Sequence, residues 1–209
     1  MSEYTNFVRD FPARCREVLK MAEGPARLRG REVTLLLMAA ASAFIVPFER
    51  LKPDEEPHAS PHPSGDRERF PEMAEAVSNL LNKPFLASEL WQNQNAESWR
   101  VGELASIAGT PDDWPALKNA KPVSSQKKVR SLLKIIRNAL AHGNLFTKGG
   151  SPVSEVIFVS TQRDKDGNIL GYSFLQVSPS DFQQLLIRWI DFLENTGVPQ
   201  AVAAELIDR

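Results

Sequence analysis

The sequence predicts a mainly α-helical protein: an antiparallel helical bundle, followed by a β-hairpin and one or two further helices. Three observations lead to this prediction. Apolar residues recur at helical spacing through most of residues 5–145, two β-rich runs flank an Asp-Gly turn, and a last apolar stripe of helical spacing follows. With 209 residues the chain is long enough for one sizeable core, so we expect a single domain over residues 1–209.

A helical hairpin is expected at the start of the chain. Residues 4–23 have apolar positions at helical spacing, and Gly24-Pro25 predicts the end of this helix. The second arm, residues 31–51, is apolar on nearly all sides, which places it in the middle of the bundle. Its apolar run has 14 residues, short of the ~20 that a membrane-spanning helix requires, so no membrane association is expected.

A Pro-rich stretch interrupts the helices. Residues 52–67 read KPDEEPHASPHPSGDR, which predicts a flexible loop. Residues 72–82 again have helical spacing, with Pro71 suited to the first turn, and short helices are expected around Trp91 and Trp99.

Residues 124–144, SSQKKVRSLLKIIRNALAHGN, form the clearest helix of the sequence. Ser124 or Ser125 can cap the free amides at its start, and Gly143 can adopt the left-handed turn at its end.

The pattern changes after residue 150. Two β-rich runs flank Asp166-Gly167, which predicts a β-hairpin over about residues 153–177. Ser178 and Asp181 then supply helix-start chemistry, and the C-terminal helices should occupy about residues 179–207, the last of them from about 199.

The composition favours a cytoplasmic protein. The single cysteine, Cys15, cannot form an internal disulfide, and secreted chains seldom carry a lone thiol. Residues 1–17 contain several charged side chains and no uninterrupted hydrophobic run, so they do not match a secretory signal.

Charge is balanced overall and uneven locally. Residues 114–154 carry eight Lys and Arg and no acidic residue, which leaves a net charge of −9 on the rest of the chain. The eight are Lys118, Lys121, Lys127, Lys128, Arg130, Lys134, Arg137 and Lys148. Such a segment is typical of proteins that bind phosphate-bearing partners, although a solvated helix face paired with acidic residues elsewhere gives the same pattern.

A helical projection divides the helix at residues 124–142 into two faces. One stripe is expected to face the core and comprises Val129, Leu133, Ile136 and Leu140, with Leu132 at its edge. Nearly opposite lie Lys128, Ser131, Ile135, Asn138 and His142. Ile135 is out of place on a wet face, which suggests that something covers it.

Three polar groups can converge at the end of this helix. Arg137 projects from the flank, and its long stem lets the guanidinium reach toward His142. Imidazole exchanges protons near neutral pH, a guanidinium binds phosphate oxygens as a planar fork, and Asn138 can orient either the ring or the substrate. These residue types suit phosphodiester chemistry. The alternative is that His142 only complements the negative end of the helix dipole.

The segment from Arg137 to His142, R-N-A-L-A-H, resembles the R-x4-6-H motif of the HEPN superfamily. These are small helical-bundle proteins, many of them in prokaryotic toxin, defence and plasmid systems. The resemblance covers about residues 5–145; the hairpin and the Pro-rich loop are not parts of the minimal family pattern.

The resemblance implies a metal-independent endoribonuclease that needs no cofactor and acts as a toxin or defence effector. The 2′-hydroxyl of RNA would attack the adjacent phosphate, leaving a 2′,3′-cyclic phosphate. Arg137 would stabilise the phosphate, His142 would be the acid/base and Asn138 would orient. A homodimer is expected through the helix that contains Ile135 and His142, and an antitoxin or regulatory protein is a further expected partner. The basic residues expected to contact RNA are Lys127, Lys128, Arg130 and Lys134.

Two other functions remain open: a non-catalytic HEPN module that binds RNA, nucleotide or protein, and an immunity-type subunit whose dimer face matters. A metal site at His58 and His62, with Asp54, Glu55 and Glu56, is disfavoured by the neighbouring prolines. Phosphate binding at Gly149-Gly150 lacks a P-loop pattern. Scattered aromatic residues such as Trp91, Trp99 and Trp114 more often belong to a core than to a base-stacking surface.

Overall fold

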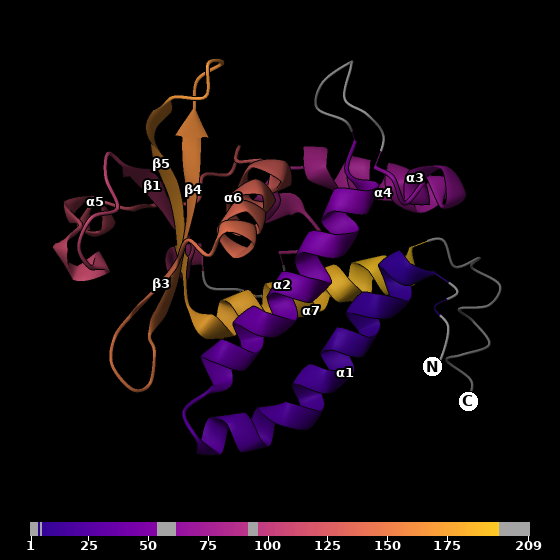
Figure 1. The fold of residues 1–209 in the computed structure, drawn as a ribbon, viewed down its shortest axis with the longest axis horizontal. Helices are drawn as coiled ribbons and strands as arrows, with labels where there is room; N and C mark the ends of the chain where they lie inside the picture. The colour runs from indigo at the N-terminus through magenta and orange to yellow at the C-terminus, as the bar shows by residue number, and fades with distance from the viewer. Residues whose placement is uncertain (1–3, 5, 54–61, 92–95, 197–209) are drawn as a thin grey trace.

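The computed structural model describes residue 4 and residues 6–53, 62–91 and 96–196. The fold is mainly helical, with a five-stranded antiparallel sheet on one side. Figure 1 shows helix α6 between this sheet and the long helices α1, α2 and α7, while the short helix α5 lies on the other face of the sheet. The main core fills the space between the sheet and the long helices, and a smaller cluster lies under α5.

The helical hairpin consists of α1 (Phe7–Leu28) and α2 (Glu32–Leu51). The prediction that α1 ends at Gly24-Pro25 is wrong, because the helix continues through both residues. The turn comes at Gly30, whose φ of 63° is the left-handed conformation that glycine adopts readily, and the Arg31 amide donates to the Ala26 carbonyl. Pro25 has no amide hydrogen to donate, but the helix still continues through it to Leu28.

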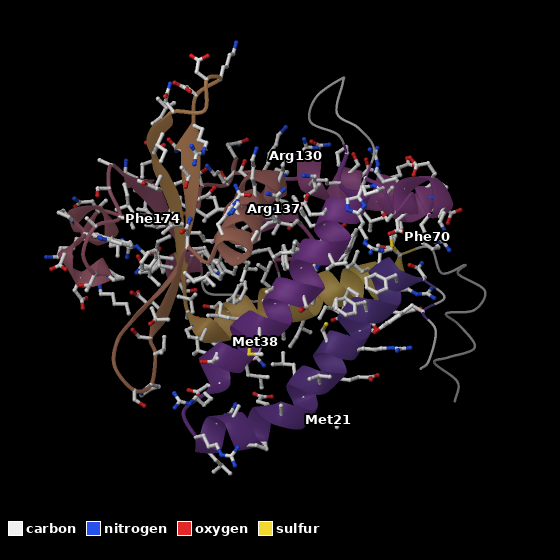
Figure 2. The ribbon with its side chains drawn as sticks, in the orientation of Figure 1. Met21, Met38, Phe70, Arg130, Arg137 and Phe174 are labelled. Carbon is white, nitrogen blue, oxygen red and sulfur yellow. The ribbon has the colours of Figure 1, made fainter. Side chains whose placement is uncertain are left out.

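Helix α2 lies at the centre of the helical layer, packed against α1, α6 and α7. Its long side chains are not buried all round: Met38, labelled on α2 in Figure 2, is 67% exposed and lines a groove between α2 and the end of α1. By length and composition alone α2 could cross a membrane, as core helices of soluble proteins also could.

A hydrogen bond that depends on Pro47 links α2 to α7 (Pro179–Asn195). A proline has no amide hydrogen, so the Ala43 carbonyl, four residues earlier, lacks its usual helical donor. The indole Nε1 of Trp189 on α7 donates to this carbonyl at 3.0 Å inside the core. The side chain of α7 thus satisfies a carbonyl that the sequence of α2 leaves unpaired.

Short elements follow the Pro-rich loop, of which residues 54–61 lie outside the described chain. They are α3 (Asp66–Arg69), α4 (Pro71–Asn82), two 3₁₀ turns at Phe85–Ala87 and Ala96–Ser98, a third at Pro111–Asp113, and α5 (Pro115–Lys118). Helix α4 matches its prediction, with Pro71 in the first turn. The helices expected around Trp91 and Trp99 are only 3₁₀ turns, and Trp99 leads directly into a strand.

The sheet has the strand order β2-β1-β5-β4-β3. Its strands are β1 (Arg100–Leu104), β2 (Lys121–Pro122), β3 (Leu145–Lys148), β4 (Glu155–Arg163) and β5 (Ile169–Val177). The two strands expected as a separate hairpin, β4 and β5, pair in register from Val156↔Val177 to Gln162↔Gly171 and continue into β1 and β3. The sheet is therefore an integral layer of the domain, because its buried residues share the core of the helices.

Helix α6 (Val129–His142) starts later than its capping signals predict. Residues 124–128 precede the helix and run beside the turn after α4: the Phe85 amide donates to the Lys127 carbonyl at 2.7 Å, and the Val129 amide to the Lys83 carbonyl at 3.0 Å. Ser124 and Ser125 therefore do not cap α6: the Lys127 amide donates to the Ser124 carbonyl in a separate turn, and the tertiary hydrogen bonds keep Lys127 and Lys128 outside the helix. Its end is as predicted, with Gly143 at a φ of 70°.

The start of α7 also matches its prediction, since the Ser178 hydroxyl accepts the Asp181 amide at 3.1 Å. Its apolar stripe, which includes Phe182, Leu186 and Leu193, is buried in the main core. The further helix expected from about residue 199 lies outside the described residues.

Candidate functional site

An open pocket of about 590 Å³ lies at the carboxyl end of α6, between this helix and strand β4. Helix α6 forms one wall of the pocket, and the end of β4 forms the opposite wall. Asn144, which follows the terminal glycine of α6, also lines the pocket. The lining residues are Lys134, Arg137, Asn138, His142, Asn144, Thr161 and Arg163. The three site residues that the motif predicts, Arg137, Asn138 and His142, therefore share one pocket.

Helical geometry explains this convergence. Lys134, Asn138 and His142 are spaced by four residues, so they lie one above another on the same face of α6. Arg137 is the neighbour of Asn138 along the helix, and its side chain bends toward it. The second half of α6 thus presents three cations or potential cations, Lys134, Arg137 and His142, and one amide to the same pocket.

Arg137 is held by two neighbours. Its Nε donates to a carboxylate oxygen of Glu49 on α2, and its Nη1 donates to the Asn138 Oδ1 at 2.6 Å. Figure 2 shows Arg137 on α6 in the region between this helix and α2. The remaining terminal nitrogen, Nη2, makes no hydrogen bond to the described residues, so it can donate to a ligand in the pocket.

Glu49 connects this arginine to a second cation. Lys52 lies 2.9 Å from its other carboxylate oxygen. Burial by itself would raise the pKa of Glu49, but the hydrogen bonds from Arg137 and Lys52 and their positive charges hold that pKa below its ordinary value. Glu49 therefore remains a carboxylate and fixes the Arg137 guanidinium.

Asn138 orients Arg137 rather than His142. Its Oδ1 accepts from Arg137, and its Nδ2 donates to the Ser160 hydroxyl of β4 at 2.8 Å. Both the oxygen and the nitrogen of the Asn138 amide are thus hydrogen-bonded within the protein. A series of hydrogen bonds from Glu49 through Arg137 and Asn138 to Ser160 joins α2, α6 and the sheet.

His142 is the last residue of α6 and is exposed. Its ring has no hydrogen bond to the described residues, and Gly143 turns the backbone away directly after it. An imidazole in this position can exchange protons with a bound substrate without first breaking an internal contact.

Ile135 contradicts its prediction. The side chain is only 7% exposed and belongs to the main core, so no partner is needed to cover it. Helix α6 packs against α2 and α4 on one side and against β4 and β5 on the other. The buried part of its circumference is therefore wider than that of a helix on the surface of a bundle. Leu140, expected in the core stripe, is half-buried.

The predicted RNA-contacting residues are divided between the two ends of α6. Lys134 lines the pocket. Lys127, Lys128 and Arg130 lie at the start of the helix, roughly 20 Å from His142 at 1.5 Å per residue. Arg130 is half-buried, and its Nε is enclosed without a hydrogen-bond partner. Only Lys134 is brought to the site.

Sequence reasoning missed Asn144, Thr161, Arg163 and the supporting Glu49 and Ser160. Only their three-dimensional proximity identifies them, since Glu49 lies 88 residues before Arg137 and Ser160 lies 22 residues after Asn138. The pocket lining contains Lys134, Arg137 and Arg163 and no acidic side chain. Its charge therefore favours an anionic ligand such as a phosphodiester.

The other candidates lie elsewhere or in the core. His58 and the residues Asp54, Glu55 and Glu56 fall outside the described chain, and in the described part no three His, Cys, Asp or Glu residues gather as a metal site would require. Trp99 and Trp114 are buried, and Trp91 packs edge-on against Phe85, so these rings belong to the interior. Gly149-Gly150 belongs to the connection between β3 and β4, away from the pocket lining.

The family model described as HEPN pEK499 p136 matches residues 1–200. The match includes the sheet and α7 as well as the helices on which the motif resemblance rests. No curated protein and no solved structure matches the chain.

Proposed function

The chain belongs to the HEPN pEK499 p136 family, and from this premise we propose that it is a metal-independent endoribonuclease. One observation carries the proposal: Arg137 and His142, the two residues of the R-x4-6-H motif, line the same open, acid-free pocket. A surface arginine and a helix-terminal histidine without a common role would not need to converge in this way. We place the enzyme among toxin or defence effectors that an antitoxin or other regulatory protein controls.

The proposed reaction is an internal transesterification. An imidazole removes the proton from the ribose 2′-hydroxyl, whose oxygen attacks the adjacent phosphorus. The bond from phosphorus to the 5′-oxygen breaks, and that oxygen takes up a proton, which leaves a 2′,3′-cyclic phosphate and a 5′-hydroxyl. Arg137 stabilises the negative charge that grows on the phosphate oxygens through its free Nη2. Asn138 and Glu49 keep the guanidinium in place.

Two proton transfers per turnover explain why two copies would act together. One chain contributes one His142 to its pocket. We propose that two chains pair through the exposed face at the end of α6, around Ala141 and His142, so that the second imidazole serves the leaving oxygen. Ile135 takes no part in this contact because it is buried within its own chain.

The test is the chemistry of the RNA ends. Purified protein is incubated with mixed RNA in EDTA, alongside a His142→Ala variant and a Lys128→Ala control at the far end of α6. The proposal predicts 2′,3′-cyclic phosphate and 5′-hydroxyl ends from the parent and the control, and none from His142→Ala. Cleavage that depends on a metal, or that His142→Ala retains at the parental rate, contradicts it.

A second function is a non-catalytic binding module that uses the same pocket. The ion pair between Arg137 and Glu49 favours it, because part of the arginine charge is already compensated within the chain. This function predicts salt-sensitive RNA or nucleotide binding without new cyclic ends.

A further inference from the structure

Strand β4 has an open edge beside the pocket. Strand β3 pairs with β4 only as far as Leu145↔Phe158, and beyond this the Val159 amide donates to the Asn144 carbonyl at 3.0 Å. In the described part of the chain no strand covers that side of β4 from residue 160 to 163.

The backbone of Thr161 faces this open edge. Successive amides of a strand point to opposite sides, so Thr161 points the same way as Val159, toward the side where β3 would continue. Thr161 and Tyr172 on β5 are accordingly a non-hydrogen-bonded pair of the antiparallel sheet, so the Thr161 amide does not donate to Tyr172. The pocket thus contains a strand amide that is available to a ligand.

Arg163 adds a permanent positive charge to the same edge. The pairing register shifts between Gln162 and Arg163, because Leu170 of β5 has no partner on β4, so a bulge of β5 lies opposite Arg163. One nitrogen of the exposed guanidinium, Nη1, donates to the Gly167 carbonyl of the turn at 2.6 Å, which anchors the side chain. No carboxylate among the described residues forms an ion pair with it.

We propose that Arg163 and the Thr161 amide form a subsite for the phosphate next to the reacting one, and that the substrate is an extended single strand of RNA. This inference rests on the proposed function of the same pocket. Helix α6 then holds the scissile linkage while the edge of β4 holds its neighbour, so the sheet takes part in substrate binding.

Two features favour a single RNA strand over other polymers. A pocket of about 590 Å³ has the size of a small-ligand site and can enclose a nucleotide or two, but not a duplex. In-line attack by the 2′-oxygen also requires a linkage that can rotate freely. An extended peptide could add to a strand edge, but the exposed edge is short and its surroundings are cationic rather than apolar.

The binding test compares Arg163→Ala with Lys165→Ala, which removes the same charge from the neighbouring turn outside the pocket lining. The probe is a labelled single-stranded oligouridylate of about ten nucleotides with 2′-O-methyl riboses, which cannot be cleaved. Arg163→Ala should weaken binding about tenfold and reduce the slope of log K against log salt by about 0.7, the value for one phosphate contact of a single strand. Lys165→Ala should leave both close to the parental values, and Arg163→Lys should restore much of the affinity.

Cleavage of the dinucleotide UpA separates this inference from the proposed function. UpA has only the scissile phosphate, so Arg163→Ala should slow the cleavage of a longer RNA at low concentration much more than the cleavage of UpA, whereas Lys165→Ala should change the ratio of the two rates little. Equal oligouridylate binding by Arg163→Ala and the parent overturns the subsite and leaves the nuclease proposal intact. A parent that binds the oligonucleotide but does not cut UpA overturns the nuclease proposal alone. Tighter Arg163-dependent binding of a duplex, or of a glutamate-rich peptide, overturns the single-stranded RNA assignment.

Discussion

Arg137 and His142 are identifiable from the sequence because their spacing matches the R-x4-6-H motif at the end of one helix. Asn138, four positions before His142, shares the face of His142, and Arg137 lies on its flank. The residues that support them are not identifiable in this way. Glu49, Ser160 and Arg163 come from α2 and β4, and nothing local in the sequence links them to α6. Ile135 shows the converse error: helical spacing marked it as exposed, and packing against the sheet buries it.

The ionisation of Glu49 should make the free energy of unfolding depend on pH. Because its pKa is lower in the folded chain than in the unfolded chain, its carboxylate stabilises the fold above the unfolded value of about 4.3, and this contribution disappears as the pH falls through the folded value. Glu49→Gln should therefore lower the free energy of unfolding by about 1 kcal/mol at neutral pH, and by progressively less in acid. It should also slow RNA cleavage, since Arg137 loses its anchor.

Urea unfolding at neutral pH and at about pH 3.5, below the unfolded value, measures this effect. The exposed Glu75→Gln on α4 is the matched control and should change neither stability nor cleavage. A difference between Glu49→Gln and the parent that is the same at both pH values would show that the ion pair does not act as described.

At the scale of elements, a long apolar pattern predicts that a helix is present better than it predicts the residues at which the helix begins and ends. The hairpin helices, α4 and α7 follow their patterns, while α1 ends only at the left-handed Gly30 and tertiary hydrogen bonds decide where α6 starts. The strands β1 and β2 could not be predicted, because they are short and β2 is exposed along both its residues. They become strands only because β5 offers an edge on which β1 can pair, and β1 then offers one to β2.

The hydrogen bond from Trp189 to the Ala43 carbonyl can be tested together with Pro47, the residue that leaves this carbonyl without a helical donor. Trp189→Phe removes the donor to the Ala43 carbonyl and should cost about 1–3 kcal/mol of unfolding free energy, the penalty for an unsatisfied buried group. In a Pro47→Ala background the new amide at position 47 can supply the missing helical bond, so the same substitution should cost clearly less.

Chemical denaturation of the four proteins measures this coupling. Trp114→Phe is the control, because the Trp114 indole donates to the Ala108 carbonyl in the other core cluster and should not respond to residue 47. If Trp189→Phe costs the same in both backgrounds, the indole does not replace the lost helical bond.

At the scale of the whole molecule, the acid-free segment at residues 114–154 forms only part of the positively charged pocket. The acid-free segment contributes Lys134, Arg137, Asn138, His142 and Asn144 to the pocket, whereas Arg163 comes from outside it. Helices alone would leave this pocket open on one side. The sheet closes it, which the sequence could not show because strand pairing depends on contacts that are distant in the chain.

A shared site between two chains has a distinctive consequence. Arg137→Ala and His142→Ala are each expected to be inactive as pure proteins. If the site is built from both chains, mixing the two variants should restore part of the cleavage, because some pairs then contain one arginine and one histidine around the same phosphate. Activity of the mixed sample is measured over a range of protein concentrations. No recovery in mixtures that form mixed pairs would show that each chain works alone.

We propose that Arg137 and His142 act on one phosphate as a unit, and the cleavage rates of three variants test this. Residues that act as a unit are strongly non-additive in their effects on rate. The cleavage rate of UpA is measured for Arg137→Ala, His142→Ala and the double variant, with folding checked by circular dichroism. We expect all three to fall to the same residual rate. A double variant that still cuts at the parental rate, or one whose loss is the product of two separate losses, would contradict the claim.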